Sequence, residues 1–385
     1  MQQRNGTFQF SATDLMQFAA CSHATALDRS HVLGQGPAPR PQGEDATLLQ
    51  AQGEVHEQGY LDRLRADGRT VTEIARDDGL TAASVATFEA MQAGADVIYQ
   101  AALAGTGPAA AWGGWADFLE RVERPSALGA YSYEVVDTKL RQRPDPKHLL
   151  QLVLYSDLLA DVQGQMPERA HVELGSGVRV GFDLAQYAAY ARRMRRRSQD
   201  FVQTPQQTRP IPCSACDLCQ WQDHCTQAWQ DGDSLFNVAN ITRQQVQKLE
   251  AAGTETLAAL AALGADERPR GLSEQSFERL RLQARHQEAR KSAAPSYELR
   301  PPQPGRGFDL LPKPQPGDVF YDIEGDPHFD GGLEYLHGIW HDTDRFTAFW
   351  AHDHDDERQA LIDLFDWLRD RLETYPTARI YHYAP

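Results

Sequence analysis

The tripeptide Asp137-Thr138-Lys139 carries a carboxylate and an ammonium group two positions apart, at the end of a predicted apolar strand. Residues two apart on a strand point from the same face of the sheet, so the two charges are expected side by side. Burying charge is costly unless the charge is paired or binds a metal ion. A metal held by Asp137, with Lys139 placed to orient a water molecule, would provide that compensation and is typical of hydrolytic sites.

A second carboxylate, Asp117, falls on the strand predicted for residues 109–122, in a segment rich in glycine and aromatic residues. The turn after this segment leads into the strand that ends at Asp137 and Lys139. Two neighbouring strands therefore place two carboxylates and a lysine at one edge of a sheet. This arrangement predicts the outline of a metal site.

Two predicted helices carry further candidate residues. The helix expected at 45–65 contains His56, although a mid-helix histidine taken alone is more often a surface or satisfied core residue than a ligand. The helix expected at 147–159 places Gln151 and Tyr155 four apart on one face. Their amide and hydroxyl groups suit phosphate oxygens. The alternative is a helix that packs on the sheet with two amphipathic residues at its rim.

The five cysteines are distributed unevenly: Cys21 stands alone near the start, and Cys213, Cys216, Cys219 and Cys225 crowd into one short segment. In a cytosolic chain such crowding predicts metal or iron–sulfur ligation before disulfides. The four crowded cysteines could close a local zinc site without Cys21. Sequential Cys-x-x-Cys steps in one small loop favour a cluster over zinc. Either role is structural, because the cysteines lie far in sequence from the carboxylates.

The composition indicates a globular protein of 385 residues with 41% hydrophobic residues, and about 150 residues per domain gives two to three domains. We expect a cytoplasmic protein without a membrane partner, because no apolar run approaches roughly 20 residues and no secretory signal is recognisable. The net charge of −16 argues against coating nucleic acid by bulk electrostatics. A local basic groove remains open for the arginines within 141–143 and 192–197, against the alternative of a solvated helix face.

The elements that must position these residues follow an α/β order. A short strand and a helix capped near Ser11 or Thr13 are expected to deliver Cys21, and a Pro/Gly-rich loop at 33–45 follows. Besides the segments already named, the predicted elements are a strand at 70–74, a helix at 84–95, strands at 170–174 and 178–182, and an Arg-rich helix at 185–201.

The composition changes beyond Cys225. Residues 237–263 predict two helices joined by a hairpin at 251–253, which resembles a helix-hairpin-helix unit; the alternative is a small helical connector. A helix at 273–290 carries alternating charges and is expected to face solvent. The Pro-rich run at 301–316 predicts a stiff linker and the clearest domain boundary.

The segment after the linker begins with a strand that ends in Asp322-x-Glu324, again two acidic groups on one face. The elements expected to follow are strands at 335–340 and 345–350, a helix at 355–373 and a strand at 378–383. This order resembles the start of an RNase H-like 3′–5′ exonuclease domain of the DEDD type. That family needs two further acidic residues from later elements, so Asp322 and Glu324 are expected to form an incomplete second acidic site.

The order of motifs in the first part resembles the RecB-like branch of the PD-(D/E)XK nucleases. The residues that carry the resemblance are Gly-x-x-His56, Asp117, Asp137-x-Lys139 and Gln151-x-x-x-Tyr155. The resemblance implies a restriction-endonuclease-like α/β core in which Asp117, Asp137, His56 and the backbone carbonyl of Thr138 hold Mg²⁺ or Mn²⁺. It further implies that Lys139 activates the attacking water, and that Gln151 and Tyr155 fix the scissile strand.

The cysteine pattern resembles that of iron–sulfur nucleases of the AddB type, which have a lone cysteine before the nuclease motifs and Cys-x-x-Cys-x5-Cys after them. The resemblance implies a [4Fe-4S] cluster on Cys21, Cys216, Cys219 and Cys225 that joins the two ends of the domain. Cys213 does not fit the four-ligand pattern, and Zn²⁺ stays the alternative cofactor.

The whole arrangement resembles a bacterial family of RecB-type nucleases, in many of which a superfamily-one helicase follows. We expect a nuclease domain at 1–232, a helical connector at 233–300, the linker at 301–316 and the start of an RNase H-like domain at 317–385. The predicted function is metal-dependent DNA hydrolysis, with exonuclease action on single strands or ends implied by the family alone. The alternative is a nucleic-acid-binding or scaffold module, without turnover, that serves a helicase partner.

Overall fold

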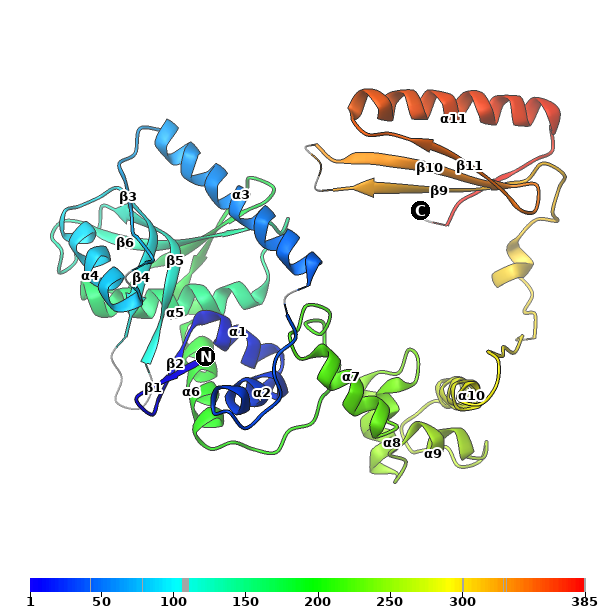
Figure 1. Ribbon diagram of the computed structural model, residues 1–385, viewed down its shortest axis with the longest axis horizontal. Coiled ribbons are helices and arrows are strands. Elements are labelled where there is room, and N and C mark those ends of the chain that lie inside the picture. The colour runs from blue at the N-terminus through cyan, green and yellow to red at the C-terminus, as the bar shows by residue number, and fades with distance from the viewer. Residues whose placement is uncertain are drawn as a thin grey trace. The chain divides into compact units, whose positions relative to one another are not determined.

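The computed structural model describes residues 1–41, 43–77, 79–105, 111–299, 301–327, 329 and 331–383. It divides into two units, Met1–Ser296 and Tyr297–Pro385, each with its own mixed α/β structure (Figure 1). The division lies just before the predicted linker at 301–316. Residues 109–110, which begin the strand predicted at 109–122, and residues 384–385, which end the predicted final domain, lie outside the described residues.

The first unit is built on a mixed sheet in which the long strand β5 (Ala111–Val122) is central. β5 runs antiparallel to β4 and β6 and pairs in parallel with β2, while β6 and β7 are parallel. The other strands are β1 (Gln2–Arg4), β2 (Thr7–Phe10), β3 (Val71–Glu73), β4 (Val97–Ala104), β6 (Ser132–Lys139), β7 (Arg169–Leu174) and β8 (Arg179–Asp183).

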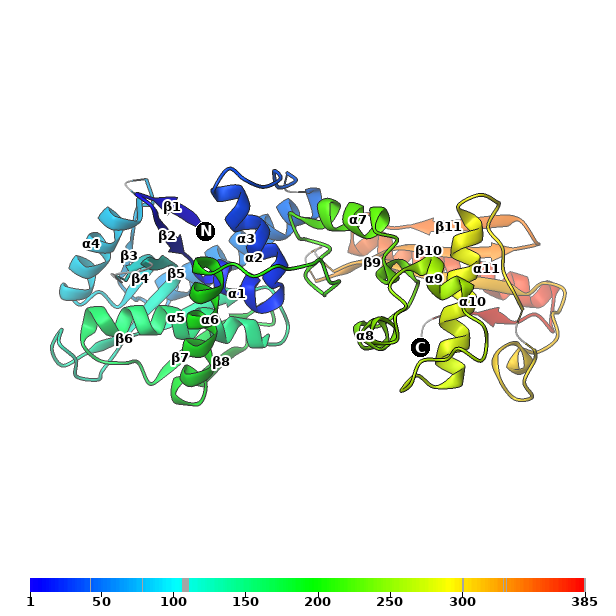
Figure 2. The ribbon, with the colours of Figure 1, turned by 90° about the horizontal axis from the view of Figure 1, so that it is seen from below.

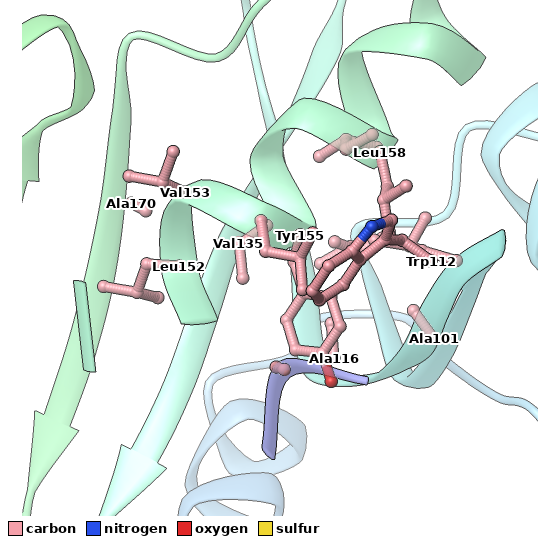
Figure 3. Close-up of a cluster of buried hydrophobic side chains, with 14 of the residues drawn as sticks. Ala101, Trp112, Ala116, Val135, Leu152, Val153, Tyr155, Leu158 and Ala170 are labelled. Carbon is pink, nitrogen blue, oxygen red and sulfur yellow. The ribbon is translucent and has the colours of Figure 1, made fainter. Parts of the chain in front are cut away.

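Helices cover both faces of this sheet. α5 packs on one face, where its apolar residues meet Val135 and Ala116 (Figure 3), and α3 packs on the other, where Tyr60 and Leu61 meet Val136. β6 is therefore buried from both sides, which explains its apolar run before Asp137. The helices around the sheet are α1 (Ala12–Ala20), α2 (Ser22–Val32), α3 (Glu44–Ala66), α4 (Gly79–Gln92), α5 (Pro146–Gln163) and α6 (Ala188–Gln203), the last after a 3-10 turn (Leu184–Gln186).

Local sequence signals set the ends of the helices that matter most for the site. Ser11 caps α1 through a reciprocal pair of hydrogen bonds with Asp14, which confirms one of the two predicted caps. Asp145 caps α5 by accepting a hydrogen bond from the Lys147 amide at 2.9 Å, and Gly164 ends it with φ 67°. α1 and α2 lie beside α6 (Figure 1, Figure 2), so helices from the beginning and from the later part of the first unit are in contact.

Four of the described strands and helices were missing from the sequence prediction: β1, β4, α2 and α7 (Gln222–Asp231). β4 pairs with β5 over most of its length, but its run of alanines has low strand propensity and hid it. α2 follows α1 after only Cys21, in a segment to which the sequence prediction assigned no element. α7 is polar, and each of its residues is at least partly exposed, so it shows no apolar face in the sequence.

A small helical core follows α7, within the first unit. Its elements are a 3-10 turn (Leu235–Asn237), α8 (Arg243–Ala251), α9 (Leu257–Ala262) and α10 (Glu274–Arg290). The predicted hairpin is confirmed, with Gly253 at φ 85° after α8, although the first helix begins at Arg243 rather than at 237. The prediction that the helix at 273–290 faces solvent is wrong. Phe277, Leu280 and Ala284 are each at most 1% exposed and form one face of α10, which packs against α9.

The second unit is a four-stranded sheet with one helix packed on it. β9, β10 and β11 are consecutive antiparallel strands, and β12 lies parallel to β9, giving the order β11-β10-β9-β12. Val319, Ile339 and Leu364 form the centre of its core. The elements are a 3-10 turn (Gly307–Leu310), β9 (Val319–Asp326), β10 (Leu333–His341), β11 (Arg345–Trp350), α11 (His354–Thr374) and β12 (Ile380–Tyr381).

Candidate active site and cysteine cluster

The two aspartates are brought together where β5 and β6 stop pairing. The pairing ends at Phe118 and Val136, and the same register places Asp117 opposite Asp137. The backbone amide and the hydroxyl of Thr138 both donate to Asp117 Oδ2, at 2.8 and 3.0 Å. Asp117 is thus fixed against the end of β6, beside the carboxylate that the sequence paired with it.

Asp137 is almost completely buried, with 1% of its surface exposed. Its Oδ1 accepts a hydrogen bond from Gln151 Nε2 at 2.8 Å, and its Oδ2 lies 2.6 Å from Lys139 Nζ. Among the described residues, Oδ2 has no further hydrogen-bond partner beyond this ion pair. Burial, and then the neighbouring charge of Asp117, raise the pKa of Asp137 to about 7.

The lysine is held in its charged form by the same carboxylates. Burial alone would lower the pKa of Lys139, but Asp137 and Asp117 outweigh burial and raise it. One ammonium faces two carboxylates, so the cluster has excess negative charge when both acids are ionised. A divalent cation would offset that excess, and the buried Oδ2 of Asp137 offers it a ligand.

A third acidic residue, Glu57, reaches this cluster from α3 and was missed in the sequence. Its carboxylate accepts hydrogen bonds from the side chains of Gln100 and Tyr99. Burial, and then the charge of Asp117, raise the pKa of Glu57. Glu57 lies three and four positions before Tyr60 and Leu61, which pack on the sheet, so helical spacing could have revealed it.

His56 reaches the end of β7, where Glu173 pairs in register with Thr138 of β6. Its Nε2 lies 3.2 Å from the backbone carbonyl oxygen of Glu173 on β7, while Arg63 pairs with the Glu173 carboxylate at 2.7 Å. His56 and Arg63 lie seven positions apart on α3 and so share one face. The predicted role of His56 as a metal ligand stays a prediction, and Glu57 is the residue of this helix that faces Asp117.

Tyr155 lies on α5 beside β5 and is 5% exposed (Figure 3). Burial, with smaller contributions from Asp117 and Asp137, raises its pKa, so the hydroxyl keeps its proton. Gly114 makes room for this ring, because a Cβ at that position would come within 2.7 Å of Tyr155 Oη. Gln151 and Tyr155 therefore both line the side of the aspartate cluster that α5 covers.

His148, in the first turn of α5, is a further residue that the sequence did not indicate. It is 7% exposed, and its Nδ1 accepts a hydrogen bond from the Asp145 amide at 3.4 Å. Burial, and then the charge of Lys139, lower its pKa to about 4. The ring is therefore neutral at pH 7 and carries its proton on Nε2.

All five cysteines line one cavity of about 1100 Å³. Cys21 lies between α1 and α2, and its Sγ accepts a hydrogen bond from the Ala24 amide at 3.4 Å. Backbone amides also donate to Cys216 Sγ at 3.3 Å and to Cys219 Sγ at 3.5 Å. Burial, and then the charges of the other four cysteines, raise the pKa of Cys225 to about 12.

Hydrogen bonds that do not involve the thiols also join the cysteine segment to the N-terminal helices. Asp28 on α2 is buried and accepts hydrogen bonds from Trp221 Nε1 and Gln220 Nε2, each at 2.7 Å. Arg40 donates to the Asp217 carbonyl at 2.9 Å. Residues about 190 positions apart are thus joined beside Cys21, as the predicted link between the ends of the domain requires.

The two predicted cofactors stay predictions, and the chemistry of the donor atoms decides whether the residues fit them. Within the described ranges, no three His, Cys, Asp or Glu side chains already stand where they could ligate one metal ion. The five thiols nevertheless share one cavity, and amide donors to sulfur are typical of iron–sulfur centres, whose potential they tune. The oxygen ligands of Asp117, Asp137 and Glu57 suit Mg²⁺ or Mn²⁺.

Asp322 and Glu324 lie on β9 of the second unit, and both are solvent-exposed. Their partners across β10 are Gly338 and Leu336. Two positions apart on a strand, the two side chains share the face opposite to the buried Val319. Their role as a second site stays a prediction.

In comparisons with known proteins, no family model and no curated protein matches this chain. No helix in the part of the chain that the structure describes has both the length and the apolar character needed to cross a membrane. The functional argument therefore rests on the geometry of the site.

Proposed function

We propose that the first unit is a metal-dependent deoxyribonuclease with the PD-(D/E)XK core of the RecB-like branch. The observation that carries the proposal is the burial of Asp137 beside Asp117, with one lysine facing two carboxylates. A scaffold protein gains nothing from a buried and partly uncompensated acidic pair, which costs stability. A hydrolytic site needs this arrangement in order to hold a cation.

Asp117 and Asp137 would hold Mg²⁺ or Mn²⁺, with Glu57, His56 or the backbone carbonyl of Thr138 completing the ligands. The ion, when bound, supplies Lewis-acid stabilisation of charge on the phosphate. Lys139 orients the attacking water and stabilises the negative charge that develops on the phosphate. Gln151 holds Asp137 in place through its hydrogen bond to Oδ1.

DNA is the proposed partner, despite the acidic net charge. On α6, Arg192 and Arg195 pair with Asp157, at 2.8 and 3.4 Å. Arg193 and Arg196 are exposed one helical turn apart and are available for the phosphate backbone. We include cleavage of single strands or DNA ends, and cooperation with a helicase, in this proposal because of the family resemblance alone.

The cleavage experiment uses labelled single- and double-stranded DNA with Mn²⁺ or Mg²⁺. We expect degradation by the wild type and a loss of at least a hundredfold in Asp137→Ala and Lys139→Ala. Asp157→Asn is the matched control, because this aspartate lies on α5 but pairs with α6, and it should retain activity. Unchanged degradation in both test variants would show that the active site is elsewhere. No degradation by any protein would favour the scaffold function.

The proposed structural cofactor is a [4Fe-4S] cluster on Cys21, Cys216, Cys219 and Cys225. The amide donors to three of these thiols support a thiolate-bound centre. Protein purified without oxygen should be brown. Its absorption should show a broad band near roughly 400 nm, as iron–thiolate clusters do. A colourless protein with stoichiometric Zn²⁺ would contradict the cluster assignment and support zinc as the cofactor.

For the second unit we propose the start of an RNase H-like domain. Three antiparallel strands followed by a helix and a parallel strand beside the first support this fold. Asp322 and Glu324 lie together on the first of these strands. They form an incomplete acidic site in this proposal, because no further acidic partner is assigned to them.

A further inference from the structure

The cysteine cavity contains one thiol more than a four-ligand centre needs. The sulfur atoms of Cys213 and Cys216 are 3.9 Å apart. The Cys213 amide donates to Cys216 Sγ at 3.3 Å, and the Cys216 amide donates to the Cys213 carbonyl at 3.1 Å. This tight turn holds both thiols on the same side of the chain, toward the same cavity.

The separation of these two sulfur atoms indicates which metal positions they can occupy. Two thiolates on one tetrahedral metal, each at about 2.3 Å, lie about 3.8 Å apart. In a [4Fe-4S] cluster each iron takes one protein thiolate, so thiolates on different irons must be farther apart than this. At 3.9 Å, Cys213 and Cys216 are too close together to bind different irons, and because one iron takes only one protein thiolate, the two thiols can only alternate at a single iron.

We infer that Cys213 and Cys216 are interchangeable ligands for one iron of the proposed cluster, while Cys21, Cys219 and Cys225 each hold one of the other irons. The inference rests on the proposed [4Fe-4S] cofactor. In the exchange, the Cys213 sulfur–iron bond forms as the Cys216 sulfur–iron bond breaks. The proton of the Cys213 thiol passes to the Cys216 thiolate, and no electron is transferred.

The amide donors explain why one of the two thiols is preferred. Cys216 Sγ accepts the Cys213 amide, and a thiolate gains more from such a hydrogen bond than a thiol does. Cys216 is therefore the ligand at rest, in agreement with the Cys-x-x-Cys-x5-Cys pattern. Cys213 takes its place when Cys216 is removed or chemically modified, so the cluster keeps four protein ligands.

The test measures iron and acid-labile sulfide per chain in full-length protein purified without oxygen. The variants are Cys213→Ser, Cys216→Ser, the double variant, and Cys219→Ser as the matched single-ligand control. We expect about four irons per chain in the wild type, and at least three quarters of the wild-type iron in each of the first two variants. The double variant and Cys219→Ser should each lose most of it. Far-UV circular dichroism checks the fold of each variant.

Three results would overturn the inference. Equal loss of iron in Cys216→Ser and Cys219→Ser would show that Cys213 cannot replace its neighbour. Retention of iron in the double variant would show that neither thiol is a ligand. Wild-type protein with one Zn²⁺ and no iron would reject both this inference and the proposed cluster, and this outcome is recognisable in the wild type alone. The nuclease proposal is independent of all three, because the measurement is metal content.

Discussion

Replacing Asp137 by asparagine should stabilise the metal-free protein at pH 8. Burial and Asp117 raise the pKa of Asp137 from 3.8 to about 7 in the folded state, which corresponds to about 4 kcal/mol. Between these values the folded protein retains a proton that the unfolded chain has released. Stability therefore falls as the pH rises from 4 to 7, and the full cost is present above pH 7.

Asparagine removes this cost and keeps the hydrogen bond from Gln151 Nε2. Lys139 loses its closest partner but still faces Asp117, so we expect a net gain of about 2 kcal/mol, or about 5 °C in Tm. Thermal unfolding followed by circular dichroism in EDTA, at pH 8 and pH 5, measures the gain, which should be much smaller at pH 5. Asp96→Asn is the control, and it should lower the stability at pH 8 rather than raise it. Hydrogen bonds from Thr70 lower the pKa of Asp96, so its ionised form stabilises the folded protein. An Asp137→Asn variant less stable than the wild type at pH 8 would refute the reasoning.

Two further substitutions test the surroundings of the site. Glu120→Gln should destabilise the first unit by about 1 kcal/mol at pH 7, because it neutralises a buried carboxylate that pairs with the solvent-exposed Arg179. Burial alone would raise the pKa of Glu120, but Arg179 and hydrogen bonds lower it. The stabilisation by the Glu120 carboxylate is therefore present above pH 4.5 and is lost as the pH falls below that value. Thermal unfolding at pH 7 and pH 4 should show a larger effect of Glu120→Gln at pH 7. Gly114→Ala should reduce cleavage about tenfold to a hundredfold by displacing the buried Tyr155, and this overpacking should also lower the stability by about 1–3 kcal/mol. Gly59→Ala, at a position with open space around it, should cleave as the wild type does.

The elements that carry the site could be predicted because their sequence signals are strong. β6 is buried on both faces and ends in charge, and α5 begins with the Asp-Pro pair of a capped helix. The pairing of Asp117 with Asp137 followed from two adjacent strands. The alternation of side chains along each strand predicts which face a carboxylate lies on. That Asp117 and Asp137 lie opposite each other follows only from the register of β5 against β6.

Other features depend on contacts between distant segments and left no local signal. β4 is rich in alanine, and its identity as a strand comes from pairing with β5. Glu57 and His56 are adjacent in sequence but differ by about 100° around α3, so one faces Asp117 and the other β7. Likewise, the contact of Cys21 with the later cysteines depends on α2 and on Asp28, which lies outside any cysteine motif.

A crystal structure of the protein with Mn²⁺, measured at a wavelength where manganese scatters anomalously, tests the central claim most directly. The account predicts an anomalous peak within about 2.3 Å of carboxylate oxygens of both Asp117 and Asp137, and no peak in Asp137→Ala. Absence of a peak at this position in crystals soaked with saturating Mn²⁺, with Asp137 still paired to Lys139, would contradict the account.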